Sequence, residues 1–321
     1  MPAISSSYPG KIILFGEHAV VYHSHAIAIP VTQIRTTAVI TPLIQYSPGT
    51  IEVSAPDINT KCRLDMLAET DPIGYAVRLT LQKLHVDKSP AFSIYITSNI
   101  PIAAGLGSGA SVSCSIAKSI STYLGKPFSP VEISDIAFEV EKLHHGIPSG
   151  VDNTVIAFGR PVFFQRGAEI QSLQVGETLH FIIADTGIKA QTGEVVGGVR
   201  LRWQADPTRF DTLFQQIDHI VLAARDAIRI GDVETTGKQM LKNHQLLQDM
   251  EVSHPALDRL VETAMSANAL GAKLSGAGRG GNMIALVREN DLPSLENALL
   301  QAGAVRVIRT RLESSFEESH V

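Results

Sequence analysis

The chain has 321 residues, of which 44% are hydrophobic and 18% are charged, and its formal net charge is −5. This length fits two domains, the negative charge argues against a general nucleic-acid surface, and no apolar run is long enough to cross a membrane. The two cysteines have no metal-ligand spacing and no signal peptide is present, which favours a reducing, cytoplasmic environment.

Strands and helices alternate in the first half of the chain. Short apolar runs bounded by proline and glycine turns predict strands over residues 11–15, 36–41, 51–54, 92–97, 153–158 and 161–165. Apolar stripes at helical spacing and a proline after a capping serine predict helices over residues 71–84, 110–124 and 130–145. The organisation changes at the strand that begins near Phe181.

The second half is richer in helix. An apolar stripe from Leu213 to Ile228 predicts one long helix, and three more are predicted over residues 234–250, 255–269 and 291–301. Strands are predicted over residues 181–185, 272–275, 283–287 and 305–310. This β-α-β ending is typical of a small ferredoxin-like α+β domain. We therefore expect a boundary near residue 178, between domains over residues 1–178 and 179–321.

One glycine-rich loop lies between a predicted strand and a predicted helix. Its glycines allow a ligand to approach the backbone, and amide N–H groups at a helix N-terminus attract anions. The sequence therefore predicts a phosphate cradle made of Pro101, Ile102, Ala103, Ala104, Gly105, Leu106, Gly107, Ser108, Gly109, Ala110 and Ser111.

The loop alone leaves alternatives. A dinucleotide-binding loop would need an acidic residue about 20 positions later at a strand end, but Glu132 and Asp135 lie in a predicted helix. A P-loop is excluded because no Gly-Lys-Ser or Gly-Lys-Thr closes the glycine run. A glycine turn without a ligand stays open.

Three further segments carry candidate side chains. Lys11 opens an apolar strand, with Glu17 and His18 after its glycine turn, although such residues are usually on the surface. Glu141 lies at the C-terminus of a predicted helix, where a carboxylate is unfavourable unless a cation compensates it. Asp152 follows in a rigid loop, and Lys273-Leu-Ser-Gly-Ala-Gly-Arg-Gly-Gly281 forms a second glycine-rich loop.

These segments together resemble the GHMP kinases over nearly the whole chain and in the same order. Within that superfamily, Pro9-Gly-Lys11, Gly16-Glu-His-Ala-Val-Val21 and Gly146-Ile-Pro-Ser-Gly-Val-Asp-Asn153 are similar to the mevalonate kinases. The resemblance implies a two-domain α+β fold. Its N-terminal, nucleotide-binding α/β domain would be ribosomal-protein-S5-like, and its C-terminal domain would be ferredoxin-like.

The resemblance also implies an activity: ATP-dependent phosphorylation of the primary hydroxyl of mevalonate to 5-phosphomevalonate, in isoprenoid synthesis. Asp152 would take the proton from the attacking hydroxyl or orient that hydroxyl, with Lys11 keeping the aspartate ionised. Glu141 would hold Mg²⁺, and Ser108 would help to bind Mg²⁺ or phosphate. The residues expected around the acceptor are Glu17, His18, Ser149 and Thr192.

Other readings stay open. Another GHMP kinase would phosphorylate phosphomevalonate, a sugar or a different hydroxyl of mevalonate. A non-catalytic sensor would have the same fold and bind a ligand without turnover. The sensor is disfavoured because Lys11, Glu141 and Asp152 are all present. The chain also departs from the superfamily, with Gly109 in place of a second serine and Arg279 in place of a glycine. An exposed strand edge could support a homodimer.

Overall fold

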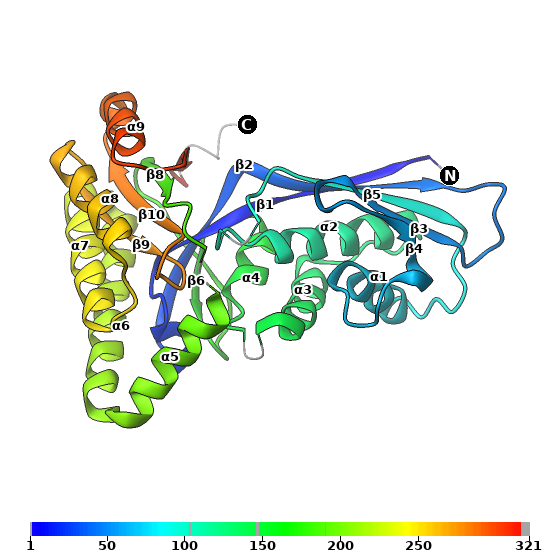
Figure 1. The fold of residues 1–321 in the computed structure, drawn as a ribbon, viewed down its shortest axis with the longest axis horizontal. Helices are drawn as coiled ribbons and strands as arrows, with labels where there is room; N and C mark the ends of the chain where they lie inside the picture. Colours follow the sequence, from blue (N-terminus) through cyan, green and yellow to red (C-terminus); the bar gives the residue numbers. More distant parts are fainter. Residues whose placement is uncertain (1, 103, 146–147, 190, 316–321) are drawn as a thin grey trace. The chain divides into compact units, whose positions relative to one another are not determined.

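The computed structural model describes residues 2–315 except residues 103, 146–147 and 190 (Figure 1). The chain divides into two compact units made of interleaved segments. Unit 1 comprises residues 1–11, 30–101 and 106–159, and unit 2 comprises residues 12–29, 102–105 and 160–321. Two long strands, β1 (Ile4–Phe15) and β2 (His25–Pro42), therefore contribute residues to both units.

The change of unit after residue 159 precedes the boundary predicted near residue 178. Strand β6 (Val162–Gln165) pairs with residues 25–28 of β2, and both segments belong to unit 2. Strand β7 (Gln171–Ser172) then pairs with β6. A division into domains over residues 1–178 and 179–321 stays a prediction.

The sheet of unit 1 is covered by helices on one face. Strands β4 (Thr60–Arg63), β3 (Ile51–Ala55), β5 (Phe92–Ser98) and β2 follow in this order, and β1 pairs with β2. β3 is parallel to β5, whereas β2 is antiparallel to it. Phe92, Ile94 and Ile96 are buried along β5 while Tyr95 is 47% exposed, as expected for a sheet with one solvated face.

The helices of unit 1 are labelled in Figure 1. They are α1 (Pro72–Lys83), α2 (Ser108–Tyr123), α3 (Pro130–His145) and α4 (Val151–Phe158). Helix α1 begins where the Asp71 side chain accepts a hydrogen bond from Gly74 N at 2.8 Å. Helix α2 packs on the strands through serine hydroxyls that donate to backbone carbonyls, namely Ser111 to Tyr8 O, Ser115 to Thr36 O and Ser119 to Ala38 O.

Helix α4 corrects the prediction of a strand over residues 153–158. The segment is short and apolar, and such a run does not distinguish a strand from a buried helix by periodicity. Gly150 adopts a left-handed conformation, φ 88°, at the N-cap of this helix. Asp152 consequently lies in the first turn of α4, rather than in a loop that leads to a strand.

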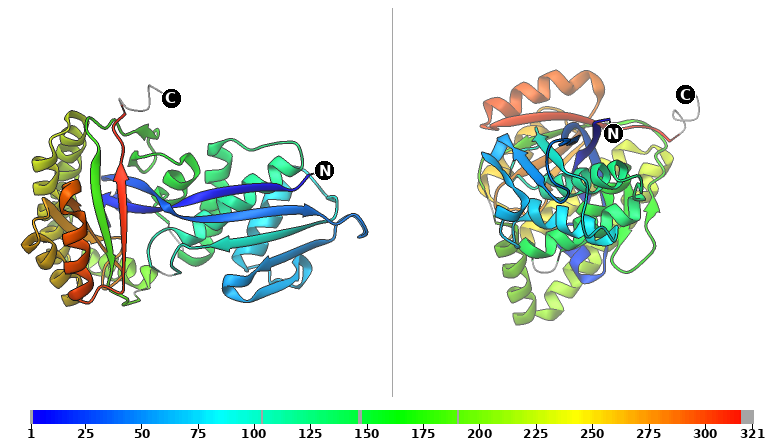
Figure 2. Two further views of the ribbon diagram at one scale, coloured as in Figure 1. Left: turned by 90° about the horizontal axis from the view of Figure 1, so that it is seen from above. Right: turned by 90° about the vertical axis from the view of Figure 1, so that its right-hand side faces the viewer.

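Unit 2 contains a four-stranded antiparallel sheet in the order β11-β8-β10-β9. In sequence, β8 (Leu179–Asp185), β9 (Gly271–Ser275), β10 (Asn282–Val287) and β11 (Arg306–Leu312) give the strand order 4-1-3-2 of a ferredoxin-like domain. Figure 2 shows the yellow to orange-red helices of this unit on one face of the sheet, whereas the light-green helix over residues 192–205 packs against the helix that follows it. The bounds of these helices are α5 (Thr192–Ala205), α6 (Pro207–Ile230), α7 (Val233–Asp249), α8 (Pro255–Ser266) and α9 (Leu292–Gln301).

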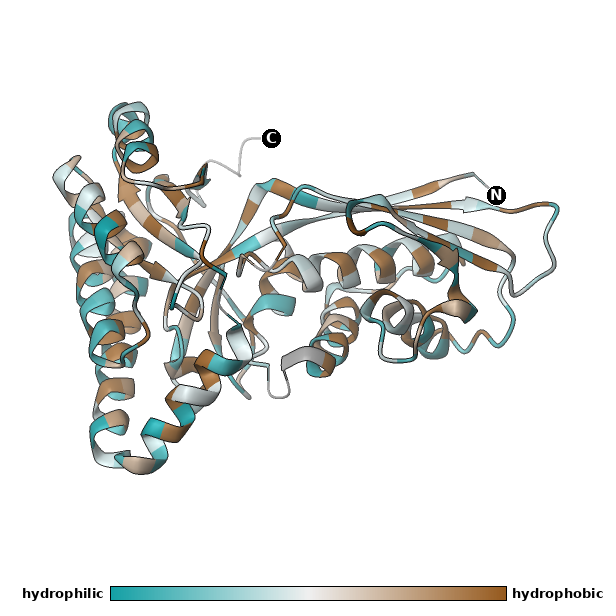
Figure 3. Cartoon of the chain, viewed as in Figure 1, coloured by the Kyte–Doolittle hydropathy of each residue, from teal (hydrophilic) through white to brown (hydrophobic). Residues whose placement is uncertain are grey.

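The core of unit 2 follows from amphipathic helices. Apolar and hydrophilic residues interleave along α6 and α7 in Figure 3. The predicted stripe on α6 is buried throughout, at Leu213, Ile217, Ile220, Ala224 and Ile228. Across residues 2–315, apart from the gaps given above, no helix is both long enough and apolar enough to span a bilayer.

Candidate active site

An ion pair joins β1 to α4 within unit 1. Lys11 Nζ lies 2.9 Å from Asp152 Oδ1. The lysine side chain is 4% exposed and the aspartate side chain is 27% exposed, so the carboxylate is the more accessible partner. The backbone N–H of Lys11 donates to Leu106 O at 3.0 Å, which ties this part of β1 to the glycine-rich loop. Two residues predicted to act together from distant motifs therefore do lie together.

Glu141, the predicted magnesium ligand, lies close to this pair near the end of α3. Burial, followed by repulsion from the Asp152 carboxylate, raises the pKa of Glu141 to about 8, while the Lys11 ammonium acts in the opposite direction. The C-terminal end of the helix dipole further disfavours negative charge there. A cation beside Glu141 would offset the repulsion from Asp152 and the unfavourable helix dipole.

The donor set near Glu141 fits a magnesium ion held jointly by protein and nucleotide. Mg²⁺ is commonly bound through one or two carboxylates together with substrate phosphates and water. No cluster of three or more histidine, cysteine, aspartate and glutamate side chains suited to a metal occurs in the described part of the chain. An ion at Glu141 would therefore need phosphate or water oxygens to complete its coordination.

The N-terminus of α2 carries the second part of the predicted phosphate loop. Gly107 has a left-handed φ of 75° at the N-cap and supplies no side-chain cap. The N–H groups of the first turn have no intrahelical acceptor and can therefore bind an anion. A Cβ added to Gly109 would meet no atom within 4 Å, so space is open beside these amides. Ser108, the first helical residue, is only partly buried.

Ser111 is engaged in the fold. Its hydroxyl donates to Tyr8 O at 2.9 Å, and its N–H donates to Gly107 O at 2.9 Å. Leu106 and Ala110 are buried apolar residues. Direct binding by this part of the loop would therefore come from Gly107, Ser108 and Gly109 and from the backbone of their neighbours.

The first part of the same loop belongs to unit 2. Ile102 is 61% exposed, and a Cβ on Gly105, at a φ of 74°, would meet nothing within 4 Å. Ala104 accepts a short hydrogen bond from the Asn282 side chain through its carbonyl oxygen. Ala103 lies outside the described residues. ATP binding by residues 101–111 stays a prediction.

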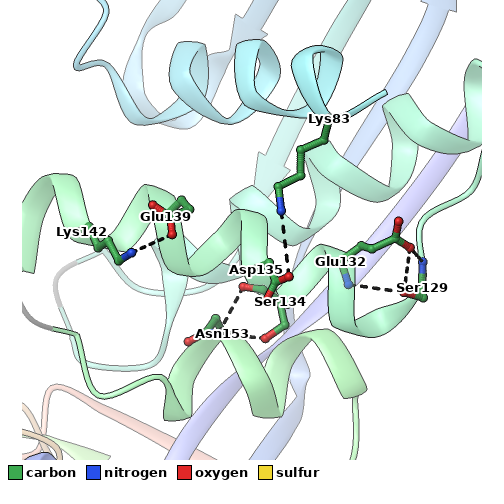
Figure 4. Close-up of polar contacts among 8 residues, drawn as sticks. All are labelled: Lys83, Ser129, Glu132, Ser134, Asp135, Glu139, Lys142 and Asn153. Carbon is green, nitrogen blue, oxygen red and sulfur yellow. Dashed lines mark hydrogen bonds and ion pairs between the residues drawn. The ribbon is translucent and has the colours of Figure 1, made fainter. Parts of the chain in front are cut away.

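Helix α3 is anchored by polar contacts at several points (Figure 4). At its start, Ser129 and Glu132 form a capping box, with Ser129 N donating to Glu132 Oε2 at 2.9 Å. In its second turn, Ser134 Oγ and Ser134 O accept hydrogen bonds from Asn153 Nδ2 of α4, at 2.8 Å and 3.2 Å. Asn153 was not among the predicted site residues, although it directly follows Asp152 in the motif.

A second ion pair is buried in unit 2. Lys273 Nζ forms a very short contact with Glu17 Oε1 and also donates to Leu274 O at 2.7 Å. The two charged side chains are 0% and 1% exposed. Burial lowers the pKa of Lys273, although Glu17 partly opposes this shift. Glu17 was predicted near the acceptor, whereas its lysine partner was missed because a lone lysine after a strand-like start is usually solvated.

His18 lies beside the second glycine-rich loop of unit 2. Its Nε2 is 2.9 Å from Ala277 O, and a carbonyl oxygen can only accept, so Nε2 carries the proton and Nδ1 remains an acceptor. Burial lowers the pKa of His18 to about 4, although the Ala277 carbonyl opposes this shift. The ring is therefore neutral near pH 7.

The second glycine-rich loop has a backbone that suits glycine. A Cβ on Gly278, at a φ of 82°, would lie 2.0 Å from Val252 O. Arg279 nevertheless adopts a left-handed φ of 56°, with its side chain exposed and its N–H donating to Val252 O at 2.7 Å. Arg279 thus adopts a conformation that costs about 1–2 kcal/mol for residues other than glycine.

The remaining predicted acceptor residues occupy helix starts. Ser149 Oγ accepts a hydrogen bond from Val151 N at 3.3 Å, just before α4 in unit 1. Thr192 is exposed and is the first residue of α5 in unit 2. Their contact with an acceptor stays a prediction.

Family models and curated relatives both identify the chain as similar to GHMP kinases. The GHMP kinases N terminal domain matches residues 72–160, and the GHMP kinases C terminal domain matches residues 224–305. The mevalonate kinase of Thermococcus sibiricus is 33% identical over 326 residues, covering 95% of each chain. The chain belongs to the mevalonate kinase family of the GHMP kinases.

Solved structures of mevalonate kinases have the same fold. The L. major mevalonate kinase, in complex with R-mevalonate, has a TM-score of 0.83 and 30% identity, and covers 97% of this chain and 96% of its own. The Methanococcus jannaschii mevalonate kinase also has a TM-score of 0.83, at 28% identity over 98% of this chain and 99% of its own. The predicted two-domain GHMP kinase fold is confirmed, and the chain is an ATP-dependent kinase.

Proposed function

We propose that the chain transfers the γ-phosphoryl group of ATP to the primary hydroxyl of mevalonate, which gives 5-phosphomevalonate and ADP. The observation that carries this proposal is the Lys11–Asp152 ion pair, with Glu141 nearby, in a chain that belongs to the mevalonate kinase family. The complex of the L. major enzyme with R-mevalonate supports the choice of acceptor.

Asp152 would receive or orient the acceptor proton. Its carboxylate is partly exposed, so a hydroxyl can approach it. As the hydroxyl oxygen attacks phosphorus, its proton would pass to the carboxylate and the bond from the γ-phosphorus to the bridging oxygen would break. Lys11 would hold the carboxylate in place and offset the negative charge of the phosphoryl group, since such transfers depend mainly on positioning and charge.

Glu141 and Ser108 would hold Mg²⁺ in this proposal. The ion would neutralise phosphate charge during transfer. Support comes from the pKa of Glu141, which burial and the Asp152 carboxylate raise further than the Lys11 ammonium lowers it, so that a cation there would be favourable. We expect Glu141→Gln to raise the Mg²⁺ concentration needed for half-maximal activity, and an unchanged value would argue that Glu141 is structural.

The acceptor contacts are proposed from the resemblance of their motifs. His18, Ser149 and Thr192 would contact the acceptor directly, with the neutral His18 ring offering Nδ1 as a hydrogen-bond acceptor. Glu17, which directly precedes His18, is 1% exposed and paired with Lys273, which supports a role without direct contact to the acceptor. We also propose that the protein is cytoplasmic and requires neither membrane nor nucleic acid. Two copies of the chain would form a homodimer.

The experiment that tests this function compares acceptors. The purified protein is incubated with ATP, Mg²⁺ and either mevalonate, 5-phosphomevalonate or galactose, and ADP release is measured. The ³¹P and ¹³C NMR spectra of the product then identify the phosphorylated oxygen. We expect ADP release with mevalonate and phosphate at its primary hydroxyl. Efficient use of another acceptor instead, or phosphate at the tertiary hydroxyl, would contradict the proposal.

A further inference from the structure

Two consecutive residues of α4 contact different parts of unit 1. Asp152 pairs with Lys11 in β1, whereas Asn153 bonds to Ser134 in α3. Successive residues of an α-helix are about 100° apart around its axis. The two contacts therefore hold the first turn of α4 from two directions, as Figure 4 shows for the side facing α3.

Ser134 lies on the helix that carries Glu141. The two residues are seven positions apart, which is about two helical turns, so they share one face of α3. A bond from Asn153 to Ser134 consequently fixes α4 against the same helix face as Glu141. The bond therefore links the helix that carries Asp152 to the helix that carries Glu141.

The other side-chain hydrogen bonds that the structure describes at the N-terminus of α4 are local, such as Thr154 Oγ1 donating to Gly150 O at 2.6 Å. The helix is only eight residues long, and its N-cap, Gly150, provides no side-chain cap. Ser149 Oγ accepts from Val151 N at a distance of 3.3 Å. The bonds of Asn153, at 2.8 and 3.2 Å, therefore link this turn to α3 in addition to the packing of the two helices.

Burial of the Asn153 side chain has a free-energy cost. Asn153 is 5% exposed, and its Oδ1 has no hydrogen-bond partner among the residues that the structure describes. An apolar side chain of similar size would avoid leaving a buried acceptor unsatisfied. Packing alone therefore does not account for an amide at this position.

We propose that Asn153 and Ser134 form a positioning pair that sets Asp152 relative to Glu141 for phosphoryl transfer. Asn153 does not contact the reacting groups in this account but acts through the helix that carries Asp152. The proposal rests on the proposed role of Asp152 in the reaction.

The test measures kcat, the KM for ATP and the melting temperature of Asn153→Leu, Ser134→Ala and Ser134→Thr, and the dissociation constant of ADP by calorimetry. We expect kcat to fall at least about tenfold in Asn153→Leu, because small misplacements of reacting groups can cost up to about 100-fold. Ser134→Ala, which keeps the carbonyl bond, should lose about threefold, and Ser134→Thr, which keeps the hydroxyl, should stay near wild type. The dissociation constant of ADP should change less than about twofold, because the turn at the start of α2 is untouched.

The matched control is Glu132→Gln, which weakens the capping box at the start of α3, two residues before Ser134 and without contact to α4 in the bonds described. It should lower the melting temperature without changing kcat. The proposal is overturned if Asn153→Leu and Ser134→Ala keep kcat within twofold of wild type, or if Glu132→Gln reduces kcat as much as they do. If Asn153→Leu does not fold, the kcat values of Ser134→Ala and Ser134→Thr test the proposal, and equal values in the two variants would overturn it.

Asp152→Asn, measured in parallel, separates this inference from the proposed function. If Asp152→Asn keeps wild-type turnover, the catalytic assignment fails, whatever the result at Asn153. If Asp152→Asn loses turnover while Asn153→Leu and Ser134→Ala do not, only the positioning role fails.

Discussion

Lys11 and Asp152 are 141 positions apart in the sequence, and their charged atoms lie 2.9 Å apart in unit 1. The ammonium is almost completely buried, while part of the carboxylate reaches solvent. Such a lysine is oriented by its surroundings before any ligand binds, which is the arrangement that favours electrostatic stabilisation of developing charge.

Replacement of Lys11 by methionine should affect the reaction more than nucleotide binding. We expect Lys11→Met to lower kcat by about 100- to 1,000-fold, the usual effect of removing one preorganised donor. The dissociation constant of ADP should change less than kcat, because the amides at the start of α2 remain. Steady-state kinetics and calorimetry on the same preparation measure both values, and parallel losses in the two would contradict a role in transfer.

Gly107 and Gly109 should respond differently to alanine. A Cβ on Gly107 would lie 2.6 Å from Ile156 Cδ1 and 2.8 Å from Lys11 Cγ, at a left-handed φ, so Gly107→Ala should destabilise the protein by more than about 1 kcal/mol. Gly109 has helical geometry and open space around it, so Gly109→Ala should leave the free energy of unfolding unchanged or raise it by up to about 1 kcal/mol.

Gly109→Ala should also be tested for nucleotide binding. If a phosphate occupies the space beside Gly109, Gly109→Ala should weaken ADP binding despite its undiminished stability. Urea unfolding and calorimetry measure the two properties separately. Equal ADP affinity in wild type and Gly109→Ala would show that no phosphate binds at this position.

Elements with a clear period were predicted closely, and short ambiguous ones were not. Helix α3 was predicted at residues 130–145, because a capping serine, a proline and regular apolar spacing agree there. Helix α4 was predicted as a strand because eight residues contain too few turns to reveal a period. Helix α5 was not predicted, since only Val195 and Val199 of its residues are buried and they form no long stripe.

The candidate site shows the same limit of local patterns. Lys11, Glu141 and Asp152 were found because their motifs resemble a known family, and their proximity required the fold. Lys273 was not assigned a role because its default environment in sequence is solvent. Only the tertiary structure brings it onto Glu17 in the interior of unit 2.

The Glu17–Lys273 pair should be costly to break from one side. Lys273→Met removes the ammonium that lies against the buried Glu17 carboxylate, so we expect a loss of about 3–5 kcal/mol in the free energy of unfolding. The double variant Glu17→Gln/Lys273→Met should recover part of that loss. As a control, Asp65→Ala removes the exposed Arg63–Asp65 pair and should change stability by less than about 1 kcal/mol. A loss in Lys273→Met no larger than in this control would contradict the buried charge.

Stability should fall in mild acid because two histidines are buried in the neutral form. Burial lowers the pKa of both His18 and His244 to about 4, with Lys273 adding to both shifts and Arg202 to that of His18. Asp258 opposes the shift at His244, as does the Ala277 carbonyl at His18. The unfolded chain therefore binds more protons than the folded chain between about pH 6.5 and pH 4.

Because the unfolded chain binds more protons than the folded chain, the free energy of unfolding decreases as the pH falls. The free energy of unfolding is undiminished by these groups above about pH 6.5 and decreases as the pH falls towards 4, by on the order of 3 kcal/mol for each ring. Urea unfolding of the wild type and of His244→Gln at pH 7.5, 6 and 5 measures the slope. The variant should show a shallower decrease, and an equal slope would mean that His244 is charged in the folded protein.

The kcat of Asp152→Asn with saturating ATP, Mg²⁺ and mevalonate tests most directly whether Asp152 and Lys11 carry out phosphoryl transfer. The substitution keeps the size of the side chain and removes its ability to accept a proton as a carboxylate. We expect kcat to fall by at least about 100-fold, while calorimetry still detects ADP binding close to that of the wild type. A kcat within a fewfold of wild type would contradict the assignment.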